Sequence, residues 1–95
     1  MPAVSTLGTV MRTWRRELGL TQEQLAERIG GGVRQAEVSR LEAGRITLPR
    51  RARFELIAAA LEFTPGELLD VFTEETARKL RAHVAEPAGL VLSLN

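Results

Sequence analysis

The sequence contains no cysteine and no tyrosine, and aromatic residues make up only 4% of its 95 residues. The absence of cysteine excludes disulfides and thiolate metal sites, and it favours a reducing compartment. Few aromatics beside plentiful alanine, leucine and arginine favour helices over a β-sandwich. No apolar run is long enough for a signal peptide or a membrane span, so we expect a cytoplasmic protein that does not enter a membrane.

Residues suited to catalysis are also scarce. His83 is the only histidine, and no cysteine or second histidine could join it in holding a metal. Gly30–Gly32 are not followed by the Lys-Ser or Lys-Thr pair of a phosphate-binding loop. We therefore expect no enzyme activity, no metal and no cofactor.

The positive and negative charges nearly cancel, but they are unevenly distributed along the chain. The formal net charge is only +1. Residues 1–50 carry eight arginines and five glutamates, whereas residues 51–95 carry five basic and seven acidic groups. The stretch from Gly44 to Arg53 has four arginines and no acid. Alone, such a run is most often a solvated surface.

The residues before this basic stretch read as two short helices joined by a glycine-rich turn. Thr21 can cap the first helix, and Gln24 completes a capping box. Gly30–Gly32 end that helix and turn the chain. Apolar residues at helical spacing predict a buried face that comprises Leu25, Ala26 and Ile29 in the first helix and Val38 and Leu41 in the second.

Apolar spacing predicts further helices on both sides of this pair. One spans about residues 6–18, a fourth begins near Pro49, and a fifth begins after the cap Thr64. A sixth runs from Thr73 to about Val84, where Pro87 and Gly89 are expected to break it, and the apolar run 90–94 is compatible with a short strand. We predict an all-α fold in which residues 1–72 form a five-helix domain and residues 73–95 form a helical or strand appendage.

The second helix of the pair presents hydrogen-bonding side chains on its outward face, namely Arg34, Gln35, Glu37 and Arg40. The major groove of DNA admits one α-helix, and arginine, glutamine and glutamate can read guanine, adenine and cytosine there. Phosphates on either side need donors, which Gln22, Arg45, Thr47, Arg50 and Arg53 can supply. These residues together predict binding to double-stranded DNA.

The sequence also resembles the Cro/C1-type (XRE-type) helix-turn-helix DNA-binding domains of phage repressors and bacterial regulators. The resemblance covers roughly Leu7 to Leu69, and it rests on MRTWRRELGLTQEQLAERIG, VRQAEVSRLEAGR and ELIAAALEFTPGELL. It implies a lambda-repressor-like five-helix fold whose third helix lies in the major groove. It also implies dimers that bind pseudo-palindromic operators.

The resemblance assigns roles to individual residues. It implies a phosphate contact for Gln22 and backbone contacts for Arg45 and Arg50. It implies a structural pair between Arg15 and Glu42 that ties the first helix to the third. The base-facing positions that it implies are Gln35, Ala36, Glu37 and Arg40.

Three features depart from the family pattern. Gly30–Gly32 make the turn about two residues longer than usual. Arg34 stands where the third helix usually has a Ser or Thr cap, which removes a side-chain acceptor worth about 1 kcal/mol. Glu37 places a carboxylate near phosphates, where it either reads cytosine or pairs with Arg34 or Arg40 along the helix.

Two functions from different classes follow from the sequence. The first is a homodimeric, sequence-specific transcriptional regulator, most simply a repressor. The second is an antitoxin or other protein-interaction module, in which residues 73–95 bind a partner protein. The apolar candidates for the dimer surface are Leu69, Phe72, Leu80, Val84, Leu90 and Leu92.

Overall fold

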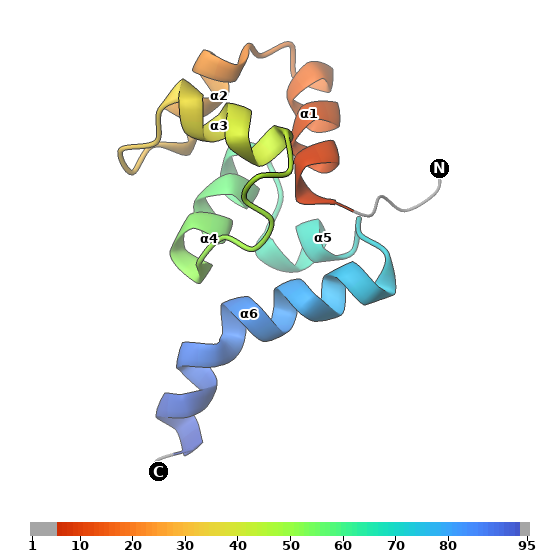
Figure 1. The fold of residues 1–95 in the computed structure, drawn as a ribbon, viewed down its shortest axis with the longest axis vertical. Coiled ribbons are helices and arrows are strands. Elements are labelled where there is room, and N and C mark those ends of the chain that lie inside the picture. Colours follow the sequence, from red (N-terminus) through yellow and green to blue (C-terminus); the bar gives the residue numbers. More distant parts are fainter. Residues whose placement is uncertain (1–5, 94–95) are drawn as a thin grey trace.

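Within residues 6–93, the chain forms six helices joined by short loops. The computed structural model describes the backbone of residues 6–93 and the side chains of residues 6–83. The helices, shown in Figure 1, are α1 (Leu7–Glu17), α2 (Gln22–Ile29), α3 (Gln35–Glu42), α4 (Arg51–Ala60), α5 (Pro65–Leu69) and α6 (Glu74–Ser93). The all-α prediction is confirmed for this part of the chain.

Threonine caps define where four of the helices begin, and at α6 the Thr73 hydroxyl accepts from the backbone N–H of Thr76. The Thr6 hydroxyl accepts from the backbone N–H of Thr9 at the start of α1. Thr21 and Thr64 each form a complete capping box, with Gln24 and Glu67 respectively. Each box satisfies backbone N–H groups that have no partner inside the helix. The chain thus starts α2 and α5 where the sequence predicts.

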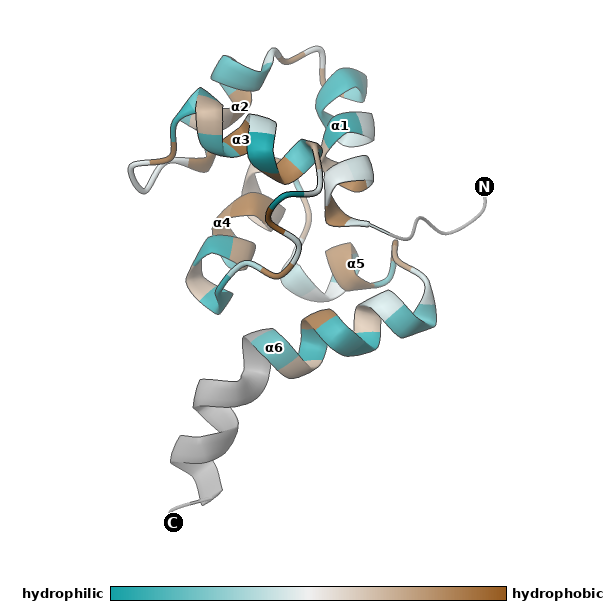
Figure 2. Cartoon of the chain, viewed as in Figure 1, coloured by the Kyte–Doolittle hydropathy of each residue, from teal (hydrophilic) through white to brown (hydrophobic). Residues whose placement is uncertain are grey.

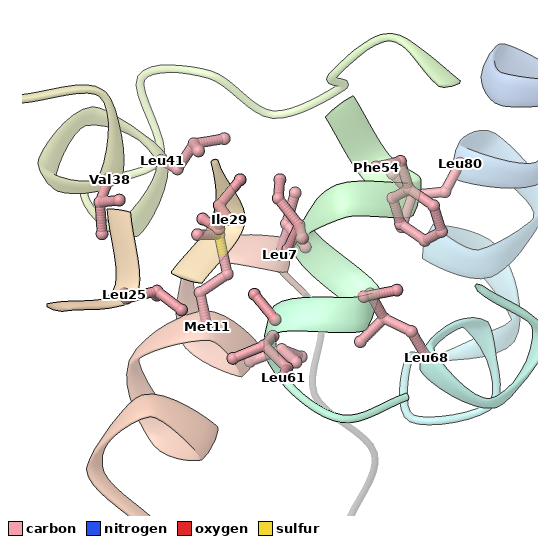
Figure 3. Packing of buried hydrophobic residues seen from close by; sticks show 14 of the residues in the cluster. Leu7, Met11, Leu25, Ile29, Val38, Leu41, Phe54, Leu61, Leu68 and Leu80 are labelled. Atoms are coloured by element: carbon pink, nitrogen blue, oxygen red, sulfur yellow. The ribbon is translucent and has the colours of Figure 1, made fainter. Parts of the chain in front are cut away.

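One hydrophobic core draws on every helix. Figure 3 shows its side chains meeting between the helices. The members labelled there are Leu7, Met11, Leu25, Ile29, Val38, Leu41, Phe54, Leu61, Leu68 and Leu80. Burying such side chains stabilises each by about 1.5–3 kcal/mol before the loss of chain entropy is counted. A chain of this size therefore depends on all six helices for its core.

The helix pair α2 and α3 lies at one end of this core. α3 packs against both α2 and α1, and α2 also packs against α4 (Figure 1). α3 and the loop that follows it lie on the viewer's side of the fold in Figure 1. The short α3 is held by neighbours on its inner face, so its outer face is left open.

The first half of α6 belongs to the core rather than to a separate appendage. Ala77 and Leu80 are 7% and 0% exposed, and α6 packs against α4 and α5. Leu69 and Phe72 are also buried. The expectation that Leu69, Phe72 and Leu80 form a dimer surface is therefore wrong, because the chain uses these side chains in its own core. None of the described helices combines the length and apolar character needed to span a bilayer.

The expected break and strand near the C-terminus do not occur within the described backbone. α6 continues through Pro87 and Gly89 to Ser93. A proline inside a helix removes one hydrogen bond and does not have to end the helix. A five-residue apolar run also fits a helix as well as a strand. The dimer candidates Val84, Leu90 and Leu92 lie outside the residues whose side chains are described.

Gly8 lets α1 approach the end of α3 very closely. A Cβ at Gly8 would lie 2.5 Å from the carbonyl oxygen of Leu41 and 2.7 Å from that of Glu42. Both obstacles are backbone atoms, so no side chain can rotate away to make room. Only glycine fits this contact between α1 and α3.

We predict that Gly8→Ala destabilises the protein by about 1–3 kcal/mol, because the new methyl group forces α1 away from α3. Gly66→Ala in α5 is the matched control, since nothing lies within 4 Å of its Cβ position. Denaturant unfolding measures both free energies. Equal stability of the Gly8→Ala variant and the wild type would show that the two helices do not need this close contact.

Candidate nucleic-acid interface

α3 separates its residues into a buried face and an exposed face. Val38 and Leu41 are almost completely buried. Four of the five predicted base-contacting residues are exposed, namely Arg34, Gln35, Ala36 and Arg40, whereas Glu37 is half-buried. In Figure 2 the ribbon of α3 alternates between teal, hydrophilic residues and brown, hydrophobic ones. The structure therefore brings these five residues together on one helix, and their contact with bases remains a prediction.

The start of α3 has no side-chain cap, as the sequence predicts. Arg34 occupies the cap position and accepts no hydrogen bond through its side chain. The N-terminus of α3 therefore keeps unpaired backbone donors and the positive end of the helix dipole. Both features favour an anion at this end of the helix.

The buried carboxylate of Glu42 joins three helices at the other end of α3. Its oxygens accept from Nε and Nη2 of Arg15 at 2.7 and 3.1 Å, and from Nε2 of Gln22 at 3.1 Å. Arg12 lies 3.7 Å away from the same carboxylate. The predicted pair of Arg15 and Glu42 is thus present, and it is bidentate. Arg12 and Gln22 complete a network that the sequence did not predict.

Glu42 stays charged in this site although it is buried. Burial alone would raise its pKa, because a low-dielectric surrounding disfavours the charged form. The hydrogen bonds from Arg15 and Gln22, with the positive charges of Arg15 and Arg12, outweigh this effect and hold the pKa of Glu42 below its usual value. The hydrogen bond with Glu42 also raises the pKa of Arg15. The pair is therefore ionised at neutral pH.

A relay of hydrogen bonds leads from Glu42 to the exposed face of α3. An ionised carboxylate only accepts hydrogen bonds, so Gln22 must turn its Nε2 toward Glu42. Its Oε1 then accepts from Nε2 of Gln35 at 2.7 Å. The amide of Gln35 is thereby oriented, and the relay leaves its Oε1 and its second N–H unused. Gln22 lies half-buried in this relay, and its predicted phosphate contact remains a prediction.

Glu37 pairs with an arginine of α4 rather than with its neighbours on α3. Its Oε2 lies 2.9 Å from Nε of Arg53. The predicted pairing along the helix with Arg34 or Arg40 is therefore wrong in its partner, because α4 passes close enough to supply a better-placed cation. Arg53 also donates weakly to the Gly31 carbonyl, at 3.4 Å.

The remaining predicted phosphate contacts lie on the loop between α3 and α4. Arg45, Thr47 and Arg50 are exposed on this loop. Arg50 is also the N-cap residue of α4, whose first turn carries no acidic residue. Arginines at the positive end of a helix are unfavourable by themselves, and an anion there relieves the repulsion. The loop and the start of α4 together form a site suited to phosphate.

The family of the chain follows from comparison with known sequences. Residues 6–72, which include α1 to α5, match the family model for a helix-turn-helix domain. The chain belongs to the helix-turn-helix domain family. No curated protein matches its sequence.

A solved structure supports the same fold for this helix-turn-helix protein. A chain of the complex of the SinR protein with the SinI protein is 25% identical, with a TM-score of 0.58. The match covers 80% of the present chain and 76% of that chain. The predicted resemblance to Cro/C1-type helix-turn-helix regulators is confirmed, and the protein is a DNA-binding regulator of this type.

Sequence reasoning missed the contacts made by long polar side chains across helices. The Glu37–Arg53 pair, the Gln22–Gln35 hydrogen bond and the contribution of Arg12 all join residues that are distant in sequence. Helical spacing identifies faces, but it does not say which exposed arginine reaches which carboxylate. The sequence does contain one indication of such a contact, namely the acidic Glu37 on an otherwise basic face. A partly buried carboxylate needs a cation, which Arg53 supplies.

We predict that Glu42→Gln destabilises the protein by roughly 3 kcal/mol at pH 7, because Arg15 is left buried without its counter-ion. Unfolded Glu42 takes up a proton near its usual pKa of 4.5, whereas folded Glu42 resists protonation to lower pH. The wild type therefore loses this stabilisation as the pH falls through and below that value, and the variant lacks this part of the pH dependence.

Denaturant unfolding from about pH 3 to about pH 7 measures the effect, because a carboxyl group titrates within this range. Glu55→Gln is the control, since Glu55 forms an exposed ion pair with Arg51 at 3.5 Å that is worth under about 1 kcal/mol. A Glu42→Gln variant with the wild-type pH profile would show that the network does not stabilise the fold.

Proposed function

We propose that the protein binds a specific double-stranded DNA site as a homodimer and represses transcription by occupying a promoter. The observation that carries the proposal is the exposed face of α3, where a supported glutamine stands among arginines. α3 would lie in the major groove, with α2 crossing the DNA backbone. Repression requires only that the bound protein exclude the transcription machinery from the same DNA.

Gln35 is the best-supported reader of a base. Its Nε2 bonds to Gln22, so its remaining N–H and its Oε1 form a donor–acceptor pair with a fixed order. Adenine offers the matching acceptor at N7 and donor at N6, whereas guanine offers acceptors only at the corresponding atoms. We propose that Gln35 reads adenine. Arg34 and Arg40 would then contact guanine or flanking phosphates.

Phosphate contacts would hold α3 in register. Arg45, Thr47 and Arg50 are exposed beside the positive N-terminus of α4. The first backbone N–H groups of α2 supply a second set of donors near Gln22. Such contacts on both sides of α3 would fix its position without reading sequence.

Two features support the homodimer, namely the small size of the DNA-binding module and the apolar residues near the C-terminus. One module of this size covers a short site, and two-fold pairing raises both affinity and site length. Half-sites would lie about 34 Å apart, one turn of DNA. Apolar residues continue beyond the core portion of α6, at Val84, Leu90 and Leu92. We propose that residues 84–95, rather than the buried Leu69, Phe72 and Leu80, contribute the pairing surface.

A partner protein is the second candidate for this segment. The similar solved chain comes from a complex of two different proteins. Residues 73–95 of the present chain would then bind an unrelated protein, as an antitoxin does. The mass of the purified chain in solution distinguishes the homodimer from binding to a partner protein. A monomer at micromolar concentration would contradict the homodimer.

We predict that Gln35→Ala weakens binding to the preferred site by roughly 1–3 kcal/mol and relaxes the preference at one base position. Arg50→Ala should instead weaken binding to all sequences alike. It should also reduce the slope of log affinity against log salt concentration by about one. Binding to labelled duplexes at two salt concentrations measures both effects.

The same titration tests DNA binding itself. Affinity of the wild type must fall steeply as salt rises, because phosphate contacts release counter-ions. No binding at low salt would contradict the proposed function. If both substitutions acted uniformly on all sequences, DNA binding would stand but α3 would not be the reader.

A further inference from the structure

The turn between α2 and α3 has little means of holding its own shape. Gly30, Gly31 and Gly32 all have positive φ, at 71°, 60° and 81°. Three consecutive glycines lose much conformational freedom on folding and offer no side chain for packing. The position of α3 on its N-terminal side therefore depends on contacts from outside the turn.

Two residues of α4 supply such contacts, beside the burial of Val33 in the core. Arg53 donates from Nη1 to the carbonyl of Gly31 at 3.4 Å, while its Nε pairs with Glu37 at 2.9 Å. Leu56 packs so close to Gly31 that a Cβ there would lie 2.9 Å from Leu56 Cδ1. One arginine thus touches both the turn and the first turn of α3.

The Glu37–Arg53 pair is more shielded than an ordinary surface ion pair. The side chains of Arg53 and Glu37 are 30% and 23% exposed, whereas those of Arg28 and Glu62 are 40% and 62% exposed. The pair lies at a groove of about 520 Å³ between α3 and α4, lined by apolar residues such as Leu41, Ile46, Leu48 and Leu56. Water reaches such a pair from fewer directions, so its attraction is screened less.

We infer that Arg53 is a positioning residue, which clamps the glycine-rich turn and the first turn of α3 onto α4 and so sets the angle at which α3 meets DNA. The inference rests on the proposed function and deepens it. It assigns to Arg53 a role other than the phosphate contact that its sequence position suggests.

The geometry favours the clamp over a phosphate contact. Arg53 already donates from Nη1 to Gly31, and its Nε lies within ion-pair distance of Glu37. Turning these nitrogens toward a phosphate would leave the Glu37 carboxylate unpaired beside the negative DNA backbone, which is repulsive. With the clamp closed, the charge of Glu37 is neutralised, and the carboxylate stays out of base reading.

Arg53→Met tests the clamp, because methionine keeps an apolar stem and removes the charge and the donors. Arg28→Met is a matched control: Arg28 bridges Glu62 at 3.1 Å and the Ala60 carbonyl at 3.2 Å, between α2 and the end of α4, without touching the turn or α3. Arg50→Met is the control for a lost phosphate contact. The readouts are affinity for the preferred and a scrambled duplex, and the slope of affinity against salt.

For Arg53→Met we expect the ratio of preferred to scrambled affinity to fall by about five-fold or more, the effect of weakening one base contact, with an unchanged salt slope. Arg28→Met should leave both the ratio and the slope unchanged. A shallower slope with an unchanged ratio, as expected for Arg50→Met, would overturn the clamp and make Arg53 a phosphate contact. An unchanged ratio and slope would also overturn it.

Amide hydrogen exchange of the DNA-free protein tests the clamp without the proposed function. Arg53→Met should speed exchange of the Val33 amide, which bonds to the Gly30 carbonyl at 3.0 Å across the turn. Arg28→Met should not speed it. If the wild type failed to bind DNA but Val33 responded in this way, the proposed function would fail while the clamp stood. Unchanged exchange at Val33 would overturn the clamp.

Discussion

The buried carboxylate of Glu42 is the interaction on which the orientation of this protein's exposed face depends. It is almost completely enclosed, yet arginines of α1 and a glutamine of α2 keep it charged. A buried charge without partners is very costly, so α1, α2 and α3 are held in the one arrangement that supplies them. The carboxylate also orients Gln22, and through Gln22 it orients Gln35. A structural ion pair and the side chain that we propose as a base reader are thus parts of one network.

α3 is a helix of only eight residues, so it cannot hold its own position. The Glu42 network holds its C-terminal end, where Gly8 allows α1 to come close. Arg53 and Leu56 of α4 hold its N-terminal end through Glu37 and the glycine turn. Its exposed residues therefore project from a helix that is supported at both ends, which is what a reader of DNA needs.

Much of the fold could be predicted from the sequence because its signals are local. The Thr21 and Thr64 capping boxes and the apolar spacing of Leu25, Ile29, Val38 and Leu41 place α2, α3 and α5 to within a residue or two at their starts. The Arg15–Glu42 pair came from the family resemblance. The predictions for Leu69, Phe72 and Leu80 failed for a physical reason. An apolar residue at helical spacing is expected to be covered, but the spacing does not say whether the chain's own core or a second chain covers it. The partner of Glu37 was missed because it depends on how α4 packs.

We propose that α3 reads a two-fold symmetric DNA site with a glutamine oriented from the protein's interior. Selection of bound duplexes from a random pool, followed by sequencing, tests this proposal. We predict an enriched site with two inverted half-sites whose centres lie about 10–10.5 base pairs apart, and an adenine at one corresponding position in each. An enriched pool without symmetry, or without any preferred base, would contradict the proposal.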